Sequence, residues 1–203
     1  MNIVPVNLAV EDELSETVLR AILSQLRGYA VGVAYRRGGF GYLRRTIRGF
    51  NNAARGTPYV VLADLDRYQC PPALIRDWLS APQHANLVFR VAVREVEAWL
   101  LAHQSALAFF LGIPEKSIPR DADSLEDPKQ TLIDLARRSR SREVRDAIVP
   151  RRGSTARIGP DYNGRLSAFA RKHWDARLAA RSSASLQRTL RKLAAFRPTW
   201  TTP

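Results

Sequence analysis

Apolar residues gather in four short runs in the first part of the chain, and each run predicts a β-strand. The third run is expected to be buried, whereas Pro5 in the first favours an edge strand or an irregular start. The runs cover residues 3–10, 29–35, 59–66 and 87–93. Outside them, apolar positions recur every three or four residues, which predicts amphipathic helices at residues 13–27, 42–54, 71–79 and 94–112. A strand, a helix and a second strand in such a short stretch predict a crossover connection, so we expect a mostly parallel sheet.

The strand pattern stops after residue 112, where prolines and acidic residues make up a loop. Helical spacing then continues at residues 128–138, 143–149, 162–173 and 185–196. We therefore expect an α/β core over residues 1–112, with helices flanking the sheet, and a mostly helical extension over residues 113–203.

Charge is distributed unevenly between the two parts of the chain. Residues 1–136 hold 15 basic and 15 acidic side chains, whereas residues 137–203 hold 17 basic and 4 acidic ones, so the whole net charge of +13 lies in the last third. A basic segment joined to a neutral domain suggests an anionic polymer as partner, with nucleic acid the first candidate. Genome base composition explains the preference for Arg over Lys equally well, but not this segregation.

Two aspartates end the third predicted strand, at Asp64 and Asp66. Side chains two apart on a strand point the same way, so these carboxylates are expected to share a face and to repel each other unless they share a cation. Carboxylate oxygens suit Mg²⁺ or Mn²⁺. The alternative interpretation is that both residues begin a loop and are simply solvated.

Further acids follow the ends of two other strands. Glu11 follows the first strand, and Glu95 with Glu97 follows the fourth. Because the carboxyl ends of parallel strands meet at one edge of a sheet, Glu11 is expected beside Asp64 and Asp66. Negative charge is also favoured at the start of a helix, which explains Glu95 and Glu97 equally well in structural terms.

Basic residues with a possible role in phosphate binding occur at several points. A glycine loop at residues 38–41 is surrounded by arginines and lacks the Gly-Lys-Ser/Thr ending of a nucleotide-binding P-loop. Such a loop can approach a phosphate closely, and a solvated loop beside a basic helix face explains the pattern equally well. Lys129 stands in the first turn of a predicted helix, an unfavourable place for a cation, which indicates another role. The candidates for nucleic-acid contact are Arg44, Arg45, Arg48, Lys129, Arg151 and Arg152.

The pattern resembles the TOPRIM domain of topoisomerases, primases, recombination-repair proteins and overcoming-lysogenization-defect nucleases. Glu11 matches that family's glutamate after the first strand, and residues 64–66 match its Asp-x-Asp motif. The run Glu-Val-Glu-Ala-Trp at residues 95–99 and the block Asp-Pro-Lys at residues 127–129 are similar to those of an uncharacterised bacterial group of TOPRIM-like proteins. Asp12 departs from the family, which usually has glycine there.

The resemblance implies a metal-dependent nuclease that takes part in bacterial defence or mobile-element conflict. Glu11, Asp64 and Asp66 would hold Mg²⁺ or Mn²⁺, and Glu95 or Glu97 would complete the catalytic site. A second hypothesis is a non-catalytic module that binds nucleic acid or a partner such as a separately encoded ATPase. A third, a small-molecule phosphohydrolase, fits the acids but not the segregated charge.

Several other classes of protein are disfavoured by the composition. The single cysteine, Cys70, permits no intramolecular disulfide, and the three histidines show no metal-ligand spacing. His103 falls on the apolar stripe of the predicted 94–112 helix and is interpreted as a core or boundary residue. No apolar run reaches membrane-spanning length, so we expect a cytoplasmic protein without a membrane partner.

Overall fold

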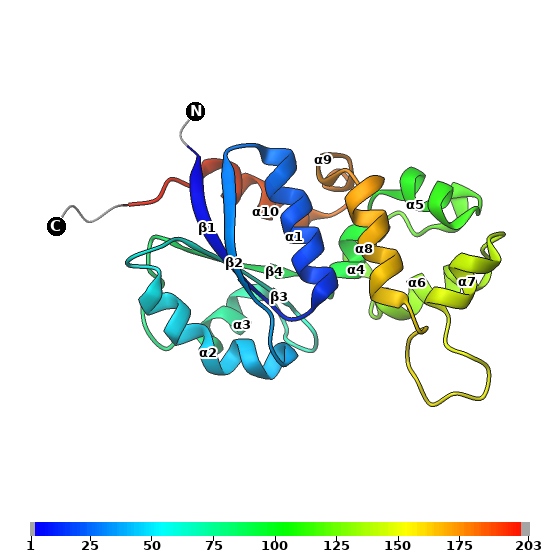
Figure 1. Ribbon diagram of the computed structural model, residues 1–203, viewed down its shortest axis with the longest axis horizontal. Coiled ribbons are helices and arrows are strands. Elements are labelled where there is room, and N and C mark those ends of the chain that lie inside the picture. The colour runs from blue at the N-terminus through cyan, green and yellow to red at the C-terminus, as the bar shows by residue number, and fades with distance from the viewer. Residues whose placement is uncertain (1–2, 200–203) are drawn as a thin grey trace.

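The computed structural model describes residues 3–199 and has a four-stranded sheet at its centre (Figure 1). The strands are β1 (Val4–Val10), β2 (Tyr29–Tyr35), β3 (Tyr59–Asp64) and β4 (Leu87–Ala92). They lie in the order β2-β1-β3-β4, and all neighbours pair in parallel. This confirms the expected α/β class, with a parallel sheet flanked by helices.

Helices cover both faces of the sheet because its strands bury side chains alternately on each side. Val60 and Leu62 of β3 join a core formed with α1 (Glu13–Leu26) and α10 (Ala184–Ala195), whereas Tyr59, Val61 and Ala63 face the other way. Helices α2 (Gly39–Ala53) and α3 (Pro71–Trp78) cover that second face (Figure 1).

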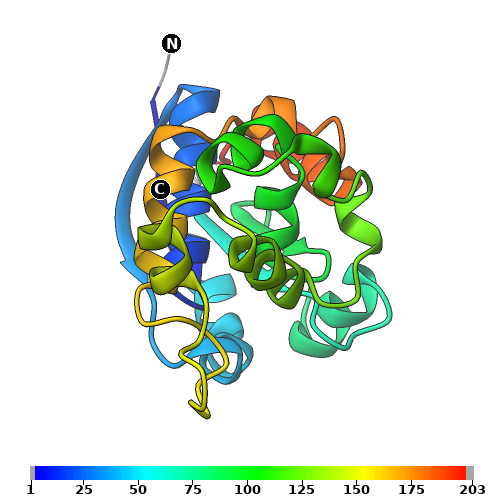
Figure 2. The ribbon, with the colours of Figure 1, turned by 90° about the vertical axis from the view of Figure 1, so that its right-hand side faces the viewer.

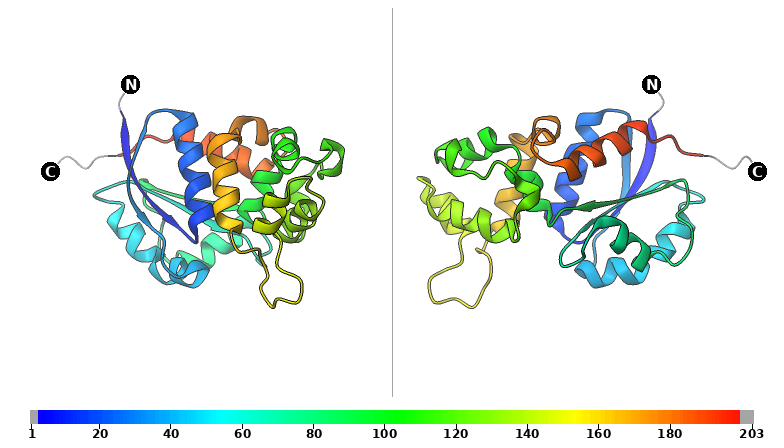
Figure 3. Two further views of the ribbon diagram at one scale, coloured as in Figure 1. Left: turned by 45° about the vertical axis from the view of Figure 1, so that its right-hand side comes forward. Right: turned by 180° about the vertical axis from the view of Figure 1, so that it is seen from behind.

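The remainder of the described chain is mostly helical, as expected, and lies beyond one end of the sheet (Figure 3). Its helices are α4 (Val96–Leu101), α5 (Gln104–Leu111), α6 (Pro128–Arg137), α7 (Arg142–Ile148), α8 (Tyr162–Lys172) and α9 (Ala176–Ala179), with short 3₁₀ turns at Glu115–Ser117 and Ala122–Ser124. None of the helices in the described residues is long and apolar enough to cross a membrane.

The single helix predicted for residues 94–112 is wrong, because α4 and α5 are separate helices. The break lies at His103, whose side chain is buried and whose Nδ1 accepts a hydrogen bond from the backbone N–H of Asp175 at 3.0 Å. His103 is therefore a buried residue, but it links two distant segments rather than extending one apolar stripe. Helix α2 also begins earlier than predicted, and α9 was not predicted.

The prediction that Asp66 continues the third strand is wrong too. The strand β3 ends at Asp64, and Asp66 has a φ of 47°, in the left-handed region. Aspartate tolerates this region better than most residues do. The backbone N–H groups of Leu65 and Asp66 both donate to the carbonyl of Arg94, at 2.8 and 3.1 Å. The chain turns here, so the alternation of side chains along the strand does not reach Asp66.

Candidate metal and phosphate site

Glu11 and Asp64 lie together at the carboxyl edge of the sheet, where β1 and β3 are neighbours. The Oε1 atom of Glu11 accepts a hydrogen bond from the backbone N–H of Asp64 at 3.0 Å. The Oδ1 atom of Asp64 in turn accepts one from the backbone N–H of Val96 at 2.9 Å. These two bonds join the ends of β1 and β3 to the start of α4 and fix both carboxylates at the edge.

The two other aspartates near this edge have different environments. Asp66 is exposed, and its backbone carbonyl accepts a hydrogen bond from the Arg94 guanidinium at 3.1 Å. Asp12 caps helix α1, because its Oδ1 atom accepts a hydrogen bond from the backbone N–H of Ser15 at 2.8 Å. Asp12 therefore has a structural role in starting α1.

Glu95 and Glu97 lie at the start of α4, and both approach the ammonium group of Lys129. The Lys129 Nζ atom is 3.2 Å from Glu95 Oε1 and 3.5 Å from Glu97 Oε1. Glu95 also accepts a hydrogen bond from the backbone N–H of Lys129 at 3.1 Å. Glu97 is buried and accepts a hydrogen bond from the Tyr162 hydroxyl at 3.0 Å. The two glutamates converge because Glu95 is still extended and precedes the first helical turn.

The pKa values of these acids are raised because the residues are removed from water and lie near like charges. Burial raises the pKa of Glu11 to about 7, with the negative charges of Asp66 and Asp12 adding to it. Burial and then the charges of Glu97 and Glu11 raise the pKa of Asp64 well above its usual range.

The pKa values of Glu97 and of its two partners, Lys129 and Tyr162, are raised as well. Burial raises the pKa of Glu97 to about 7, although the nearby Lys129 opposes this. Burial alone lowers the pKa of Lys129, but the charges of Glu97 and Glu95 outweigh it and raise the pKa. Burial and the charge of Glu97 raise the pKa of the Tyr162 hydroxyl, so it remains a hydrogen-bond donor.

The donors at Glu11 and Asp64 fit a hard divalent cation. Both are carboxylates whose ionised forms are disfavoured by burial and by each other, which a bound cation would reverse. No cluster of three or more His, Cys, Asp or Glu side chains arranged to hold a metal occurs within residues 3–199. A Mg²⁺ ion often uses only one or two carboxylates and completes its shell with water and substrate phosphate, which is the arrangement that fits here.

The predicted nucleic-acid contacts fall on two separate parts of the molecule. Arg44, Arg45 and Arg48 lie on α2, where the Arg44 guanidinium is 3.0 Å from the Asp77 carboxylate of α3. Arg151 and Arg152 follow α7 and line a groove that also contains Lys129 and Glu95. The structure therefore places Lys129, Arg151 and Arg152 in one groove with Glu95 and does not bring the α2 arginines into that groove.

Three residues of this region were not singled out from the sequence. Tyr162 was assigned only to the start of a helix, and its contact with Glu97 joins positions 65 residues apart. Arg137 and Arg157 line the same groove as Arg151. A tyrosine at a predicted helix start and arginines in an arginine-rich region give no local signal that distinguishes them from surface residues.

The similarity of this chain to known proteins lies in three-dimensional structure. No model of a protein family matches the sequence, and no curated protein matches it. Among solved structures, the C-terminal region of the Burkholderia pseudomallei OLD protein is similar, with 15% sequence identity and a TM-score of 0.43. The match covers 93% of this chain and 96% of that one.

Proposed function

We propose that this protein is a metal-dependent phosphodiesterase that cleaves nucleic acid. Glu11 and Asp64 would hold Mg²⁺ or Mn²⁺, with Asp66 as a further ligand. The observation that carries the proposal is the close approach of Glu11 and Asp64 at the carboxyl edge of the sheet, where the Glu11 carboxylate accepts a hydrogen bond from the backbone N–H of Asp64. The side chains of both residues have raised pKa values. Partly buried acids that lie close together cost stability, and this cost is relieved when a cation binds.

A bound metal would neutralise the scissile phosphate and lower the pKa of a water molecule. The chain's own residues then supply orientation and proton transfer. Glu97 has a pKa of about 7 and is held by Tyr162, so it is suited to exchange a proton near neutral pH. Glu95 holds Lys129 beside the site through two hydrogen bonds, which keeps an ammonium group available to a phosphate oxygen.

Nucleic acid is the proposed substrate because of where the positive charge lies. The last 67 residues, 137–203, hold the whole net charge of +13. Arg151 and Arg152 of this segment share a groove with Glu95 and Lys129. We assign backbone contacts to these residues and, on a second surface, to Arg44, Arg45 and Arg48.

One observation favours the second candidate function, a non-catalytic module for nucleic acid or for a partner such as a separately encoded ATPase. Lys129 already provides a positive charge within 3.5 Å of both Glu95 and Glu97. An internal cation of this kind neutralises part of the acidic cluster without a metal. In this second function the acidic cluster is stable without metal and has a structural role.

Cleavage of labelled DNA and RNA, both single- and double-stranded, decides between the two. We expect cleavage with Mg²⁺ or Mn²⁺, no cleavage with chelator, and none from the Asp64→Asn/Asp66→Asn variant, which keeps the side-chain shapes. Equal activity in both proteins would place the reaction elsewhere. Binding without cleavage in both proteins under all metal conditions would establish the non-catalytic module.

A further inference from the structure

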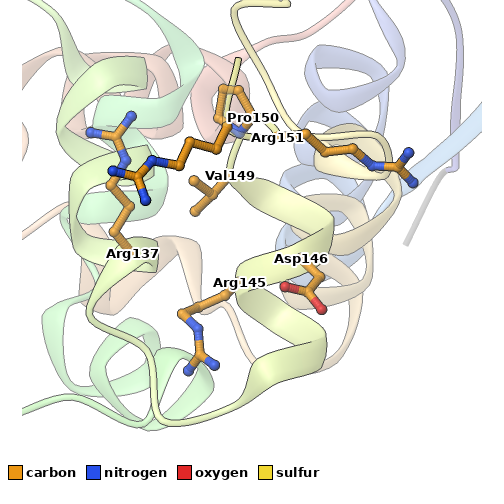
Figure 4. Close-up of a pocket in the computed structure, with 7 residues that line it drawn as sticks. Arg137, Arg145, Asp146, Val149, Pro150 and Arg151 are labelled. Atoms are coloured by element: carbon orange, nitrogen blue, oxygen red, sulfur yellow. The ribbon is translucent and has the colours of Figure 1, made fainter. Parts of the chain in front are cut away.

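A basic groove leads away from the acidic site along one side of α6. Its walls are α6 and the segment from Val149 to Arg157, and its volume is about 910 Å³. Lys129, Ile133 and Arg137 line the α6 wall at positions i, i+4 and i+8, so they follow one face of that helix. A smaller pocket adjoins it, where Arg137, Arg145 and Arg151 surround Val149 and Pro150 (Figure 4). The groove therefore begins at Glu95 and continues between arginines.

The opposite wall is a loop whose two ends are fixed to α7. The backbone N–H of Gly159 donates to the Ile148 carbonyl at 2.9 Å, and that of Asp161 donates to the Ala147 carbonyl at 3.0 Å. Gly159 is so close to α7 that an added Cβ would lie 2.2 Å from the Ala147 oxygen. The residues between these ends, 150–158, project from the helical part as a long loop (Figure 2). A closed base with an exposed tip is the form of an Ω-loop, which is frequently functional.

Both walls of the groove are attached to the acidic cluster. The α6 wall begins at Lys129, which binds Glu95 through its backbone and its side chain. The loop leads directly into α8, whose first residue, Tyr162, donates to Glu97. Glu95 and Glu97 are neighbours at the start of α4, so the groove has a fixed position relative to the site.

The charge of the groove is suited to a polyanion. Its two acids are engaged, since Glu95 pairs with Lys129 and Asp127 accepts a hydrogen bond from the backbone N–H of Gln130. Within residues 3–199, Arg151, Arg152 and Arg157 are exposed and form no salt bridge with an acidic side chain. Among the arginines that line the groove, only Arg137 has an acidic partner in the described part of the chain, and this surface pair with Asp134 contributes little to stability.

We propose that this groove binds the sugar–phosphate backbone of a double-stranded nucleic acid without reading its sequence, and leads it to the acids. This inference deepens the proposed function, and it rests on that function for the statement that the bound nucleic acid is the substrate. No aromatic side chain is among the described residues that line the groove. Sites for single strands combine positive charge with aromatic rings on which bases stack, whereas contacts to a duplex backbone need only the charge.

The test measures equilibrium binding of fluorescent duplex DNA, duplex RNA and single strands over a range of salt concentrations. Chelator is present, so the measurement is independent of metal-dependent cleavage. The variant is Arg151→Gln/Arg152→Gln. The matched control is Arg55→Gln/Arg191→Gln, which removes the same charge from exposed positions that do not line the groove. Thermal unfolding of each variant establishes that it is folded.

We expect the wild type to bind duplex more tightly than a single strand of the same length and to bind unrelated sequences equally. The groove variant should lose about tenfold in duplex affinity at low salt, and its slope of log K against log salt should fall by about 2. The control should change neither quantity.

Three results would overturn the inference: no detectable binding, tighter binding of single strands, or a groove variant that binds like the control. If the proposed function fails but the groove inference holds, the results differ from these three. The wild type then binds duplex but does not cleave it, and the groove variant loses that binding. The inference about the groove would then stand, and the site would belong to the non-catalytic module.

Discussion

Glu11 shows how the acidic site is balanced against stability. Its pKa in the folded protein is about 7, compared with 4.5 for an unperturbed glutamate. The ionised form is therefore disfavoured by folding, and the cost is fully present above pH 7 and disappears as the pH falls below 4.5. We predict that Glu11→Gln, whose amide oxygen can still accept from Asp64, raises the free energy of unfolding at pH 8 by up to about 3 kcal/mol. Urea denaturation without metal at pH 8 and at pH 4 measures this.

Metal provides the control for that prediction. If Glu11 is a ligand, Mg²⁺ should raise the melting temperature of the wild type at pH 8 and leave that of Glu11→Gln unchanged. A variant that is no more stable than the wild type at pH 8 would show that Glu11 is already compensated. An equal Mg²⁺ effect on both proteins would remove Glu11 from the metal site.

Lys129 is expected to stabilise the fold through the buried Glu97. Removing one partner of a buried pair leaves an uncompensated charge. Because Lys129 is about a third exposed, we predict that Lys129→Met lowers the free energy of unfolding at pH 8 by about 2–3 kcal/mol, less than for a fully buried pair. The loss should be smaller at pH 5, where Glu97 is protonated, and smaller in Lys129→Met/Glu97→Gln. A loss equal at both pH values and in both variants would show that packing, not charge, is responsible.

At the scale of single residues, the sequence indicates which side chains are unusual better than it indicates their partners. The unfavourable position of Lys129 in a first helical turn was visible, but Glu95 and Glu97 as its partners depend on the packing of α6 against α4. The prediction that Asp64 and Asp66 share a face is wrong, because the alternation of side chains along a strand ends where the chain turns. Backbone hydrogen bonds from Leu65 and Asp66 to the Arg94 carbonyl hold that turn.

At the scale of elements, Gly159 is a sensitive position in the loop beside α7. A Cβ there would lie 2.2 Å from the Ala147 oxygen and 2.5 Å from the Ile148 carbonyl carbon, which are backbone atoms and cannot move aside easily. We predict that Gly159→Ala lowers the free energy of unfolding by about 2–3 kcal/mol. It should also weaken duplex binding, because the loop would move away from α6. Chemical denaturation and the binding assay measure the two effects.

Gly49 of α2 is the matched control for Gly159. No atom lies within 4 Å of the Cβ position there. Alanine in an open helical position should raise the free energy of unfolding by about 0.5–1 kcal/mol, because it favours the helix more than glycine does. If Gly159→Ala were as well tolerated as Gly49→Ala, the loop would not be held as tightly against α7 as its hydrogen bonds indicate.

The strands were predicted well because each is a short run rich in apolar residues, which leaves a strong local signal. The runs of β3 and β4 are buried almost throughout, whereas β2 has no fully buried residue. The break between α4 and α5 was not predicted, because the residue that contacts it lies far away in the sequence. His103 is placed by a hydrogen bond from Asp175, 72 residues later in the chain. The apolar spacing continues across the break, so periodicity alone predicts one long helix.

At the scale of the whole molecule, the distribution of charge suggests two parts of the chain, whereas the hydrophobic core joins them. The charge changes sharply near residue 137, and the strand pattern ends before residue 112. A single cluster of buried apolar side chains nevertheless extends from Val6 on β1 to Phe196 beyond α10. The boundary at residue 112 stays a prediction about composition and element type, since the core that supports the sheet includes residues from both sides of it.

This continuity predicts that residues 1–112 do not fold alone. The Trp99 indole donates to the Ser185 hydroxyl at 2.7 Å, and the Trp174 indole donates to the Trp99 carbonyl at 2.9 Å. Without α8 and α10, this buried tryptophan and the part of the sheet that α10 covers would be exposed as an apolar patch, which promotes aggregation. We expect the 1–112 fragment to aggregate or to lack a cooperative thermal transition, while the full chain unfolds in one step. Two separate transitions in the full chain, with the first or second reproduced by the isolated fragment, would instead establish two independent domains. In that case the groove and the acids would belong to separate domains whose relative position is not fixed. The contacts of Lys129 and Tyr162 with the acids would then not guide a bound nucleic acid to the site.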